Sequence, residues 1–381
     1  MRILHTSDWH LGRQFHGVAL EDDHDHALVQ ILSVIDDHQP DVLIVAGDIF
    51  DRANPPQSAL KRLSEFLRTV RATSSAAIVL IAGNHDSAAQ IGALGVLATD
   101  GEAIVRGPLD EDERPLVLSD DHGPVAISAL PFAYEYAARL CFEDEEIACP
   151  ADVIRAQLAS ARKHVADGMR WVVVAHAFVD GAATSESERP LMRMVGGIET
   201  VSATAFEGAH YVALGHLHRP QSVGLDHVRY SGAPLAFGFD EEGQEKSVSL
   251  IDLAPDGTVE VTEFPIKPLR HVRTIRGKLL ELLAATEVSN DLVRVVLTDE
   301  NPQIDAMKRI RALFPNAVQL AYERNERPVA QRLEEQRAAI DDPHTLASTF
   351  LDIVRGDPLT EAEADIVASA LNAFATAEVG Q

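Results

Sequence analysis

Cysteine is scarce in this chain. Only Cys141 and Cys149 occur among its 381 residues, both in an acidic stretch, and they do not form a CxxC pair. Their number and spacing support neither a disulfide framework nor a zinc site built from thiolates. The sequence therefore predicts a protein of a reducing compartment.

Long hydrophobic runs are also missing. No apolar run approaches the roughly 20 residues that a membrane-spanning helix needs. The N-terminus, MRILHTSDWH, places Thr, Ser and Asp where a signal peptide would need its apolar segment. We therefore expect a cytoplasmic protein that is not associated with a membrane.

Positive charge is in short supply. The chain has 33 Lys and Arg against 59 Asp and Glu, a net charge of −26. Such a surface should repel nucleic acid over most of its area. Composition alone thus argues against DNA binding, unless metal ions at a site or a basic partner provide local attraction.

The N-terminal part has the pattern of an α/β protein. Short β-branched runs alternate there with helical patterns, which is typical of βαβ units and of a largely parallel sheet covered on both faces. The predicted strands are Arg2–Thr6, Asp41–Ala46 and Ala77–Ala82, with amphipathic helices at Asp22–His38 and Gln57–Arg71. Ligands bind at the carboxyl ends of strands in such sheets.

Later strands are expected to extend this arrangement. They are Val125–Leu130, Trp171–Ala175 and Tyr211–Leu214, so that the sheet would carry five polar loops on one rim. The alternating runs Ser247–Leu253 and Thr258–Phe264 flank a Pro-Asp-Gly turn and predict a hairpin. This hairpin is expected to close a first domain of residues 1–268.

The C-terminal part is expected to hold three further segments. An α+β domain of residues 269–324 is predicted from strands His271–Ile275, Leu292–Leu297 and Val318–Tyr322 and from helices Lys278–Thr286 and Gln303–Phe314. A linker, 325–342, and a helical tail, 343–381, should follow. Thr360 and Glu363 predict a capping box at the last helix.

Polar clusters follow five of the predicted strands. Their oxygen and imidazole donors are Asp8, His10, Asp48, Asn84, His176, His216 and His218. Such a set suffices for two cations, since a carboxylate such as Asp48 can bridge two ions about 3.5–4 Å apart. Mixed imidazole and oxygen donors suit Mn²⁺ or Fe²⁺ better than Mg²⁺, and manganese is our prediction.

Each of these features alone has an ordinary structural explanation. A His after a strand often satisfies a polar group of the core, and Gly-Asp and Gly-Asn are common turn dipeptides. Those explanations do not account for the joint order of D-x-H, GD-x-x-D, GNHD, a strand-ending His and GH-x-H. The order therefore favours a metal centre.

The order resembles that of the calcineurin-like metallophosphoesterases. The motifs DWHLG, GDIFD, GNHD, GHLHRPQ and YSGAP are similar to those of the SbcD nuclease family, and the likeness covers essentially the whole chain. It implies a two-sheet sandwich with flanking helices, a small α+β capping domain and a C-terminal helical tail. It also implies one metal held by Asp8, His10, Asp48 and His218, and a second held by Asp48, Asn84, His176 and His216.

His85 directly follows Asn84, so its side chain should point elsewhere. It could act on the leaving group as a general acid or charge stabiliser, the role that the resemblance implies. The alternative is that it orients a metal ligand. Asp51 and Asp86 are expected to be hydrogen-bonding loop residues rather than ligands, and His5 a core or supporting residue.

The resemblance also implies a partner. The chain has no G-x-x-x-x-G-K-[ST] loop, so any ATP dependence must come from another chain. That chain would be an SbcC-like, SMC-type ATPase, within a heterotetramer that contains a homodimer of this protein. The complex would degrade double-stranded DNA ends and open hairpins in DNA repair, recombination and replication.

The tail is the expected docking element for this ATPase. It offers apolar stripes at Phe350, Leu351 and Val354 and at Val367, Leu371 and Phe374. The alternative is a terminal hairpin folded on its own domain.

Other functions are compatible with the same residues. A phosphomonoesterase or a cyclic-nucleotide phosphodiesterase could use the same metals, and the acidic charge favours such an enzyme. A non-enzymatic assembly subunit is also conceivable, although the intact ligand set opposes it.

Overall fold

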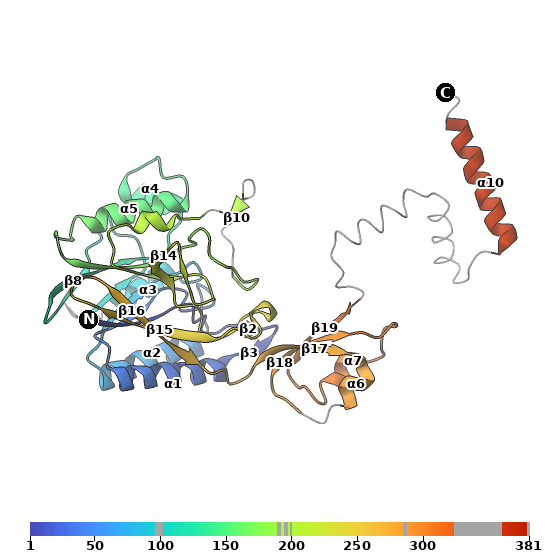
Figure 1. The fold of residues 1–381 in the computed structure, drawn as a ribbon, viewed down its shortest axis with the longest axis horizontal. Coiled ribbons are helices and arrows are strands. Elements are labelled where there is room, and N and C mark those ends of the chain that lie inside the picture. Colours follow the sequence, from blue (N-terminus) through green and yellow to red (C-terminus); the bar gives the residue numbers. More distant parts are fainter. Residues whose placement is uncertain are drawn as a thin grey trace. The chain divides into compact units, whose positions relative to one another are not determined.

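The computed structural model describes residues 1–95, 102–188, 192–193, 197–198, 200–284, 288–323 and 360–378. The chain forms two compact units (Figure 1). One comprises Met1–Ile275, Ala285–Val295 and Asp305–Gln319, and the other Arg276–Ala284, Val296–Ile304 and Leu320–Gln381. The domain boundaries expected from the sequence stay predictions.

A first six-stranded sheet has the order β16-β15-β1-β4-β5-β6. Its strands are β1 (Arg2–Thr6), β4 (Val42–Val45), β5 (Ala77–Ile81), β6 (Ala103–Arg106), β15 (Lys246–Leu253) and β16 (Val259–Ile266). Strands β1, β4, β5 and β6 are parallel to one another. The predicted hairpin β15–β16 pairs with β1 in the antiparallel direction.

A second six-stranded sheet has the order β13-β14-β12-β9-β8-β7. Its strands are β7 (Leu116–Asp120), β8 (Gly123–Leu130), β9 (Arg170–His176), β12 (Tyr211–Gly215), β13 (Gln221–Val223) and β14 (Leu225–Tyr230). The expectation of a single sheet is therefore wrong, because β8, β9 and β12 belong to this second sheet and do not pair with β1, β4 or β5. Continuous apolar strands carry no signal that tells one fully buried sheet from two.

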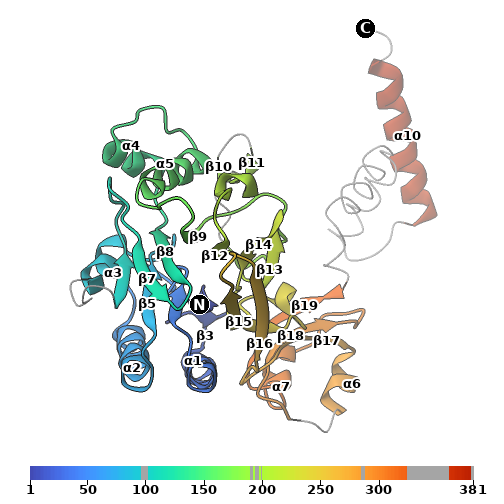
Figure 2. The ribbon, with the colours of Figure 1, turned by 60° about the vertical axis from the view of Figure 1, so that its left-hand side comes forward.

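The two sheets pack face to face. Alternate strand residues such as Ile44, Val79 and Val174 form an apolar core between them. The opposite face of the first sheet packs on α1 (Glu21–His38) and α2 (Gln57–Thr73), and that of the second sheet packs on α5 (Pro150–Arg162). Figure 2 shows α1 and α2 side by side. The sandwich with flanking helices is thus confirmed.

Shorter elements complete this arrangement. They are β2 (Gln14–Phe15), β3 (Val18–Ala19), α3 (Ala88–Leu94), α4 (Glu135–Phe142), β10 (Met192–Arg193), β11 (Gly197–Ile198) and the 3₁₀ turns Ala203–Phe206 and Phe239–Glu241. Within the described part of the chain, no helix combines the length and apolar character that spanning a bilayer requires.

A three-stranded sheet follows in the order β17-β18-β19. Its elements are β17 (Val272–Gly277), α6 (Leu279–Ala284), β18 (Leu292–Leu297), α7 (Ala306–Ile310) and β19 (Ala317–Tyr322). The predicted helix Gln303–Phe314 is too long. The backbone N–H of Gln303 donates to the Tyr322 hydroxyl at 2.7 Å, which gives this residue a partner outside a helix.

The last described helix is α10 (Glu361–Glu378). The Glu363 carboxylate accepts hydrogen bonds from the backbone N–H and the hydroxyl of Thr360, at 2.9 and 2.8 Å, which is half of the predicted capping box. Phe350, Leu351 and Val354 lie outside the described residues, as do the side chains of Leu371 and Phe374.

Candidate metal centre

The carboxyl ends of five strands from the two sheets meet at one place. Strands β1, β4 and β5 lead to Asp8, His10, Asp48 and Asn84, and strands β9 and β12 lead to His176, His216 and His218. Asn84 is half-buried, and the other six side chains are buried. The structure therefore brings together all seven donors that the sequence singled out.

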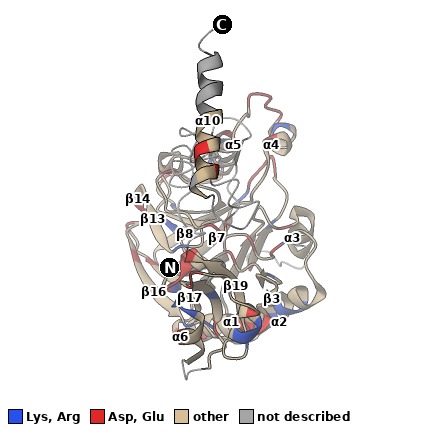
Figure 3. Ribbon diagram, turned by 90° about the vertical axis from the view of Figure 1, so that its right-hand side faces the viewer, with Lys and Arg blue, Asp and Glu red and all other residues tan. Residues whose placement is uncertain are grey.

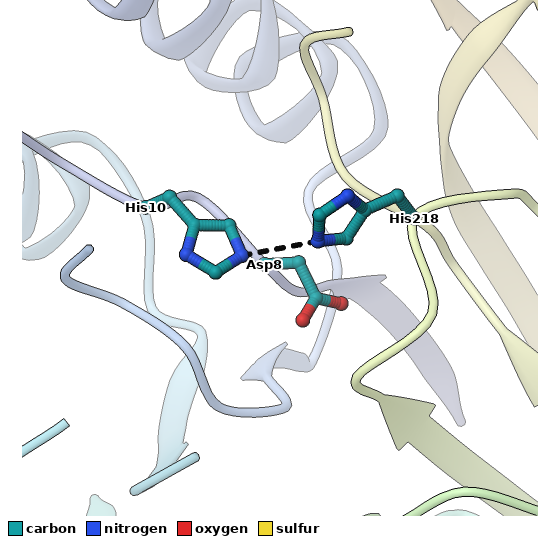
Figure 4. A group of neighbouring side chains, drawn as sticks. All are labelled: Asp8, His10 and His218. Atoms are coloured by element: carbon teal, nitrogen blue, oxygen red, sulfur yellow. Dashed lines mark hydrogen bonds between the residues drawn. The ribbon is translucent and has the colours of Figure 1, made fainter. Parts of the chain in front are cut away.

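One group of donors is formed by Asp8, His10 and His218, whose ligand atoms all lie within 4.8 Å of one another. The Nε2 atoms of His10 and His218 are 3.1 Å apart (Figure 4). Asp48 lies next to this group, since its Oδ2 atom is 3.8 Å from His10 Nε2.

A second group is formed by Asp8, Asp48 and His176. His176 Nε2 lies 3.5 Å from Asp48 Oδ2 and 3.0 Å from Asn84 Oδ1. His216 Nδ1 is also 3.1 Å from Asn84 Oδ1. Asp48 Oδ2 thus faces both groups, which is the position that a bridging carboxylate needs.

The loops that carry these donors are backbone-strained. Asp8, His10, Asp48 and His216 have φ values of 54°, 46°, 49° and 108°. Non-glycine residues rarely adopt such angles, which cost about 1–3 kcal/mol each and cluster at functional sites. Backbone hydrogen bonds hold the loops together, from Asp8 N–H to the Gly47 carbonyl and from His10 N–H to the Asp48 carbonyl, both at 3.0 Å.

Glycines in the motifs make room for the neighbouring loop. A Cβ atom on Gly83 would lie 2.2 Å from Asp48 Oδ1, and one on Gly215 would lie 1.9 Å from the Ala46 carbonyl oxygen. Any side chain at these positions would displace the donors. The glycines of GNHD and GHLH are therefore required by the close approach of the loops.

Hydrogen bonds outside the site orient three of the imidazole rings. His176 Nδ1 lies 2.9 Å from the Ala46 carbonyl oxygen, and His85 Nδ1 lies 2.7 Å from the Asp51 carbonyl oxygen. A carbonyl only accepts, so Nδ1 carries the proton in both rings and Nε2 is turned towards Asp48. His218 Nδ1 is 2.8 Å from the Ser187 hydroxyl, so its Nε2 also faces the site.

The donor atoms fit divalent cations. In a neutral His176 the Nε2 lone pair faces Asn84 Oδ1 and Asp48 Oδ2. All three atoms are then hydrogen-bond acceptors, and they repel one another unless a proton or a cation lies between them. His10 Nδ1 is buried without a hydrogen-bond partner in the described structure. Carboxylate, amide oxygen and imidazole are all donors for Mn²⁺ and Fe²⁺.

Burial and mutual proximity shift the pKa values of these groups. Burial raises the pKa of Asp8 to about 8. Burial alone would lower the pKa of His176, but the Asp48 carboxylate raises it to about 9. Burial lowers the pKa of His216 to about 3. Without a cation, protons on Asp8 and His176 would thus compensate part of the negative charge near neutral pH.

Supporting residues that the sequence did not predict hold His218. The Glu241 carboxylate accepts hydrogen bonds from the Ser187 hydroxyl and from Lys246 Nζ, both at 2.5 Å, and lies 3.5 Å from His218 Nδ1. Glu188 accepts from the His218 backbone N–H at 2.7 Å. Glu241 stands in an acidic segment, FDEEGQEK, that resembles a surface turn, so no sequence signal pointed to its burial.

Three other polar residues make contacts around the centre. The Asp86 carboxylate accepts hydrogen bonds from the backbone N–H groups of Ile49, Phe50 and Gly83 and so ties two of the loops together. Asp51 faces Arg13 at 3.6 Å, although its carboxylate also lies near His10 and His85. His5 bonds Tyr211 Oη and the Leu214 carbonyl and so connects the two sheets.

Comparisons with known proteins agree with this geometry. Residues 1–149 match the family model of the calcineurin-like phosphoesterases, and residues 266–354 match the model described as type 5 capsule protein repressor C-terminal domain. The chain is 27% identical over 371 residues to the SbcD subunit of the nuclease SbcCD of Staphylococcus epidermidis, with 96% of each chain covered. It is 28% identical to the corresponding SbcD subunit of Staphylococcus saprophyticus, with 94% of this chain and 95% of the relative covered.

Metal affinity should rise with pH. Asp8, with a pKa of about 8, and His176, with a pKa of about 9, must each release a proton to bind a cation. We expect the association constant for Mn²⁺ to increase by up to about 100-fold per pH unit below pH 8, where both groups hold protons, and to level off above pH 9.

Isothermal titration calorimetry in buffers of different ionisation enthalpy would count the released protons. The stability of the metal-free protein should change in the opposite sense. Raised pKa values stabilise it at low pH, and this contribution is lost as the pH rises through about 8 for Asp8 and about 9 for His176. An affinity that is equal at pH 6 and pH 8 would contradict the predicted proton release.

Glu241→Gln should weaken metal binding without removing a ligand. The carboxylate orients His218 through Nδ1, and loss of such a contact typically lowers metal affinity by about 10–100-fold. Mn²⁺ titration followed by calorimetry measures the effect. The exposed neighbour Glu245 offers a matched control, because Glu245→Gln changes the net charge equally. Circular dichroism should accompany both variants, since Glu241→Gln deprives the buried Lys246 of its carboxylate.

Proposed function

Because the chain matches the calcineurin-like phosphoesterases over residues 1–149 and is similar to SbcD nuclease subunits over nearly its whole length, we propose that it hydrolyses phosphodiester bonds of DNA with two divalent metal ions. On this proposal it is an exonuclease on duplex ends and an endonuclease on single strands and hairpins. The observation that carries the two-metal proposal is the position of Asp48, whose Oδ2 faces His10 on one side and His176 on the other.

This arrangement supports the two sets of ligands that we propose. Asp8, His10, Asp48 and His218 would hold one ion, and Asp48, Asn84, His176 and His216 the other. Manganese is the proposed metal, with Fe²⁺ or Mg²⁺ as alternatives. Two such ions, when bound, neutralise the charge that develops on the phosphoryl oxygens during an in-line displacement.

His85 is the proposed general acid. The hydrogen bond from its Nδ1 to the Asp51 carbonyl fixes the ring, and Nε2 points towards the site at 3.9 Å from Asp48 Oδ2. Its ring lies 4.7 Å from that of His10, centre to centre. With a proton on Nε2, the ring can donate to the leaving oxygen, while Nδ1 stays committed to the carbonyl.

An SbcC-like ATPase is the proposed partner. The relatives carry a name that makes them one subunit of a complex, and the sequence lacks a phosphate-binding loop of its own. We propose the C-terminal tail as its docking element, a homodimer of this chain within the complex, and the cytoplasm as the compartment. Two free cysteines are consistent with a reducing environment.

Net charge bears on how DNA is held. Helix α1 carries acidic but no Lys or Arg side chains, and the neighbouring α2 carries mainly basic ones. Red and blue therefore lie close together in this region (Figure 3), and the Arg62 guanidinium bonds the Asp25 carboxylate there. The total of −26 disfavours tight duplex binding by the isolated chain. On this proposal the metal ions and the ATPase supply the missing attraction.

Digestion of an end-labelled duplex, with and without the ATPase, tests the proposal. We expect cleavage that depends on Mn²⁺, and stimulation by ATP only in the presence of the partner. Hydrolysis of p-nitrophenyl phosphate or cyclic nucleotides without cleavage of DNA would instead support the phosphomonoesterase or cyclic-nucleotide phosphodiesterase alternative.

His85→Ala should separate chemistry from metal binding. Loss of a general acid typically lowers turnover by about 10²–10⁴-fold, and the metal content should stay at the wild-type level because His85 is not a proposed ligand. Turnover on duplex DNA and the metal content by mass spectrometry are the measurements. Asp48→Ala serves as the control that should lose metal. If His85→Ala loses metal as Asp48→Ala does, the ring is a ligand and the proposed role is wrong.

A further inference from the structure

A row of exposed aromatic rings lies beside the candidate metal centre. Tyr134 is 49% exposed and Tyr136 is 61% exposed, at the start of α4. In contrast, Tyr211 and Tyr230 are completely buried. Leu140, on the same helix, is 80% exposed. Clusters of large, exposed apolar side chains are a feature of binding sites.

The rings form a continuous series that starts at the centre itself. The Phe132 ring meets that of His176 edge to face at 6.4 Å, and Tyr134 meets Phe132 edge to face at 5.1 Å. The rings of Tyr134 and Tyr136 are then nearly parallel, with an angle of 13° and centres 5.9 Å apart. The series thus leads from a proposed metal ligand to the solvent.

The same residues line a cavity that reaches the centre. It has a volume of about 550 Å³, and its walls include Asn84, Phe132, Tyr134, Tyr136 and Leu140. This volume lies in the range of small-molecule sites. Asn84 is both a wall of the cavity and a proposed metal ligand. A substrate whose phosphate lies at the metals would therefore have its neighbouring groups at the aromatic wall.

We propose that Tyr134 and Tyr136 form a stacking site for an unpaired nucleobase next to the scissile phosphate. The inference rests on the proposed nuclease function and names how that site holds a single strand. A flat aromatic face accepts any base, because every base has a π-face, and the contact needs no positive charge. Stacking therefore suits a chain of net charge −26, which cannot rely on the phosphate backbone alone.

The phenol rings are suited to this role in two further ways. Each ring has few rotatable bonds, so binding a base costs little side-chain entropy. Tyr136 also lies within α4, which holds its backbone in one conformation. Duplex bases have both faces covered by stacking, so the site selects a strand end, a hairpin loop or a melted terminus.

Tyr136→Ala tests the proposal on two matched single-stranded oligonucleotides. One has all its bases, and the other has an abasic residue next to the cleaved bond. Loss of one stacked base corresponds to about 1–3 kcal/mol, so kcat/KM on the first substrate should fall by roughly 5–150-fold. On the abasic strand the loss should shrink to less than about 2-fold, because no base remains to stack. Tyr136→Phe should restore cleavage of the first substrate, since it keeps the ring.

A binding measurement keeps this test apart from the test of nuclease function. With Ca²⁺ in place of Mn²⁺, emission of 2-aminopurine at the same position should be quenched by the wild-type protein and less by Tyr136→Ala. Quenching in the presence of Ca²⁺, together with no cleavage by the wild type in the presence of Mn²⁺, would refute the proposed function but support the stacking site.

Three outcomes would overturn the stacking site. Equal cleavage of both substrates by the wild type and Tyr136→Ala would leave the rings as a surface for a protein partner. An equal loss on the abasic strand would show that the tyrosine acts on something other than a base. A loss in Leu140→Ala as large as that in Tyr136→Ala would show a general apolar contact rather than stacking.

Discussion

The structure of the centre depends on one buried carboxylate. Asp48 Oδ1 accepts a hydrogen bond from the His85 backbone N–H at 2.8 Å, which fixes the group and leaves Oδ2 turned to the imidazoles. His176, His10 and His85 lie 3.5, 3.8 and 3.9 Å from that oxygen. A buried, ionised carboxylate that faces imidazole lone pairs rather than N–H donors is strongly destabilised. The centre therefore requires positive charge, as protons or as metal ions, and its loops accept unfavourable backbone angles in order to meet there.

The sandwich makes this concentration of polar groups possible. Its two sheets share a core of fully buried aliphatic residues, such as Val172 and Val174, which stabilises strands on both sides of the interface. Strand ends can then carry strained residues, because the strands themselves are held by the core and by helices on their outer faces. Groups far apart in the sequence become neighbours only through this packing. The contact of His10 with His218 spans 208 residues.

The sequence predicted eight of the twelve strands in the two six-stranded sheets, missing β6, β7, β13 and β14. It also singled out the seven side chains that meet at the strand ends, and the reason for both is local. Runs such as Val42–Val45 are apolar throughout and end at a glycine and a charged residue, so both the strand and its end are visible in the pattern. Division into two sheets is not local, since it depends on which strands pair, and only the likeness to a known family suggested it. Glu241 and Lys246 were missed for a similar reason. Their burial depends on packing against His218, and charged residues in a glycine-containing segment usually lie on the surface.

The pairing of basic side chains within the fold bears on how so acidic a chain would act on the proposed polyanionic substrate. Arg62 bonds Asp25, Arg170 bonds Asp120 and Arg270 bonds Asp23, so several guanidinium groups serve the fold rather than the solvent. Long-range attraction of DNA by the isolated chain is therefore weak, and contacts have to be made at short range. Metal ions can hold one phosphate, and an aromatic face can hold one base, but neither recognises a long stretch of duplex. On these proposals, an enzyme with only these contacts would depend on a partner to bring DNA to it, and its own selectivity would be for places where the strands are already separated.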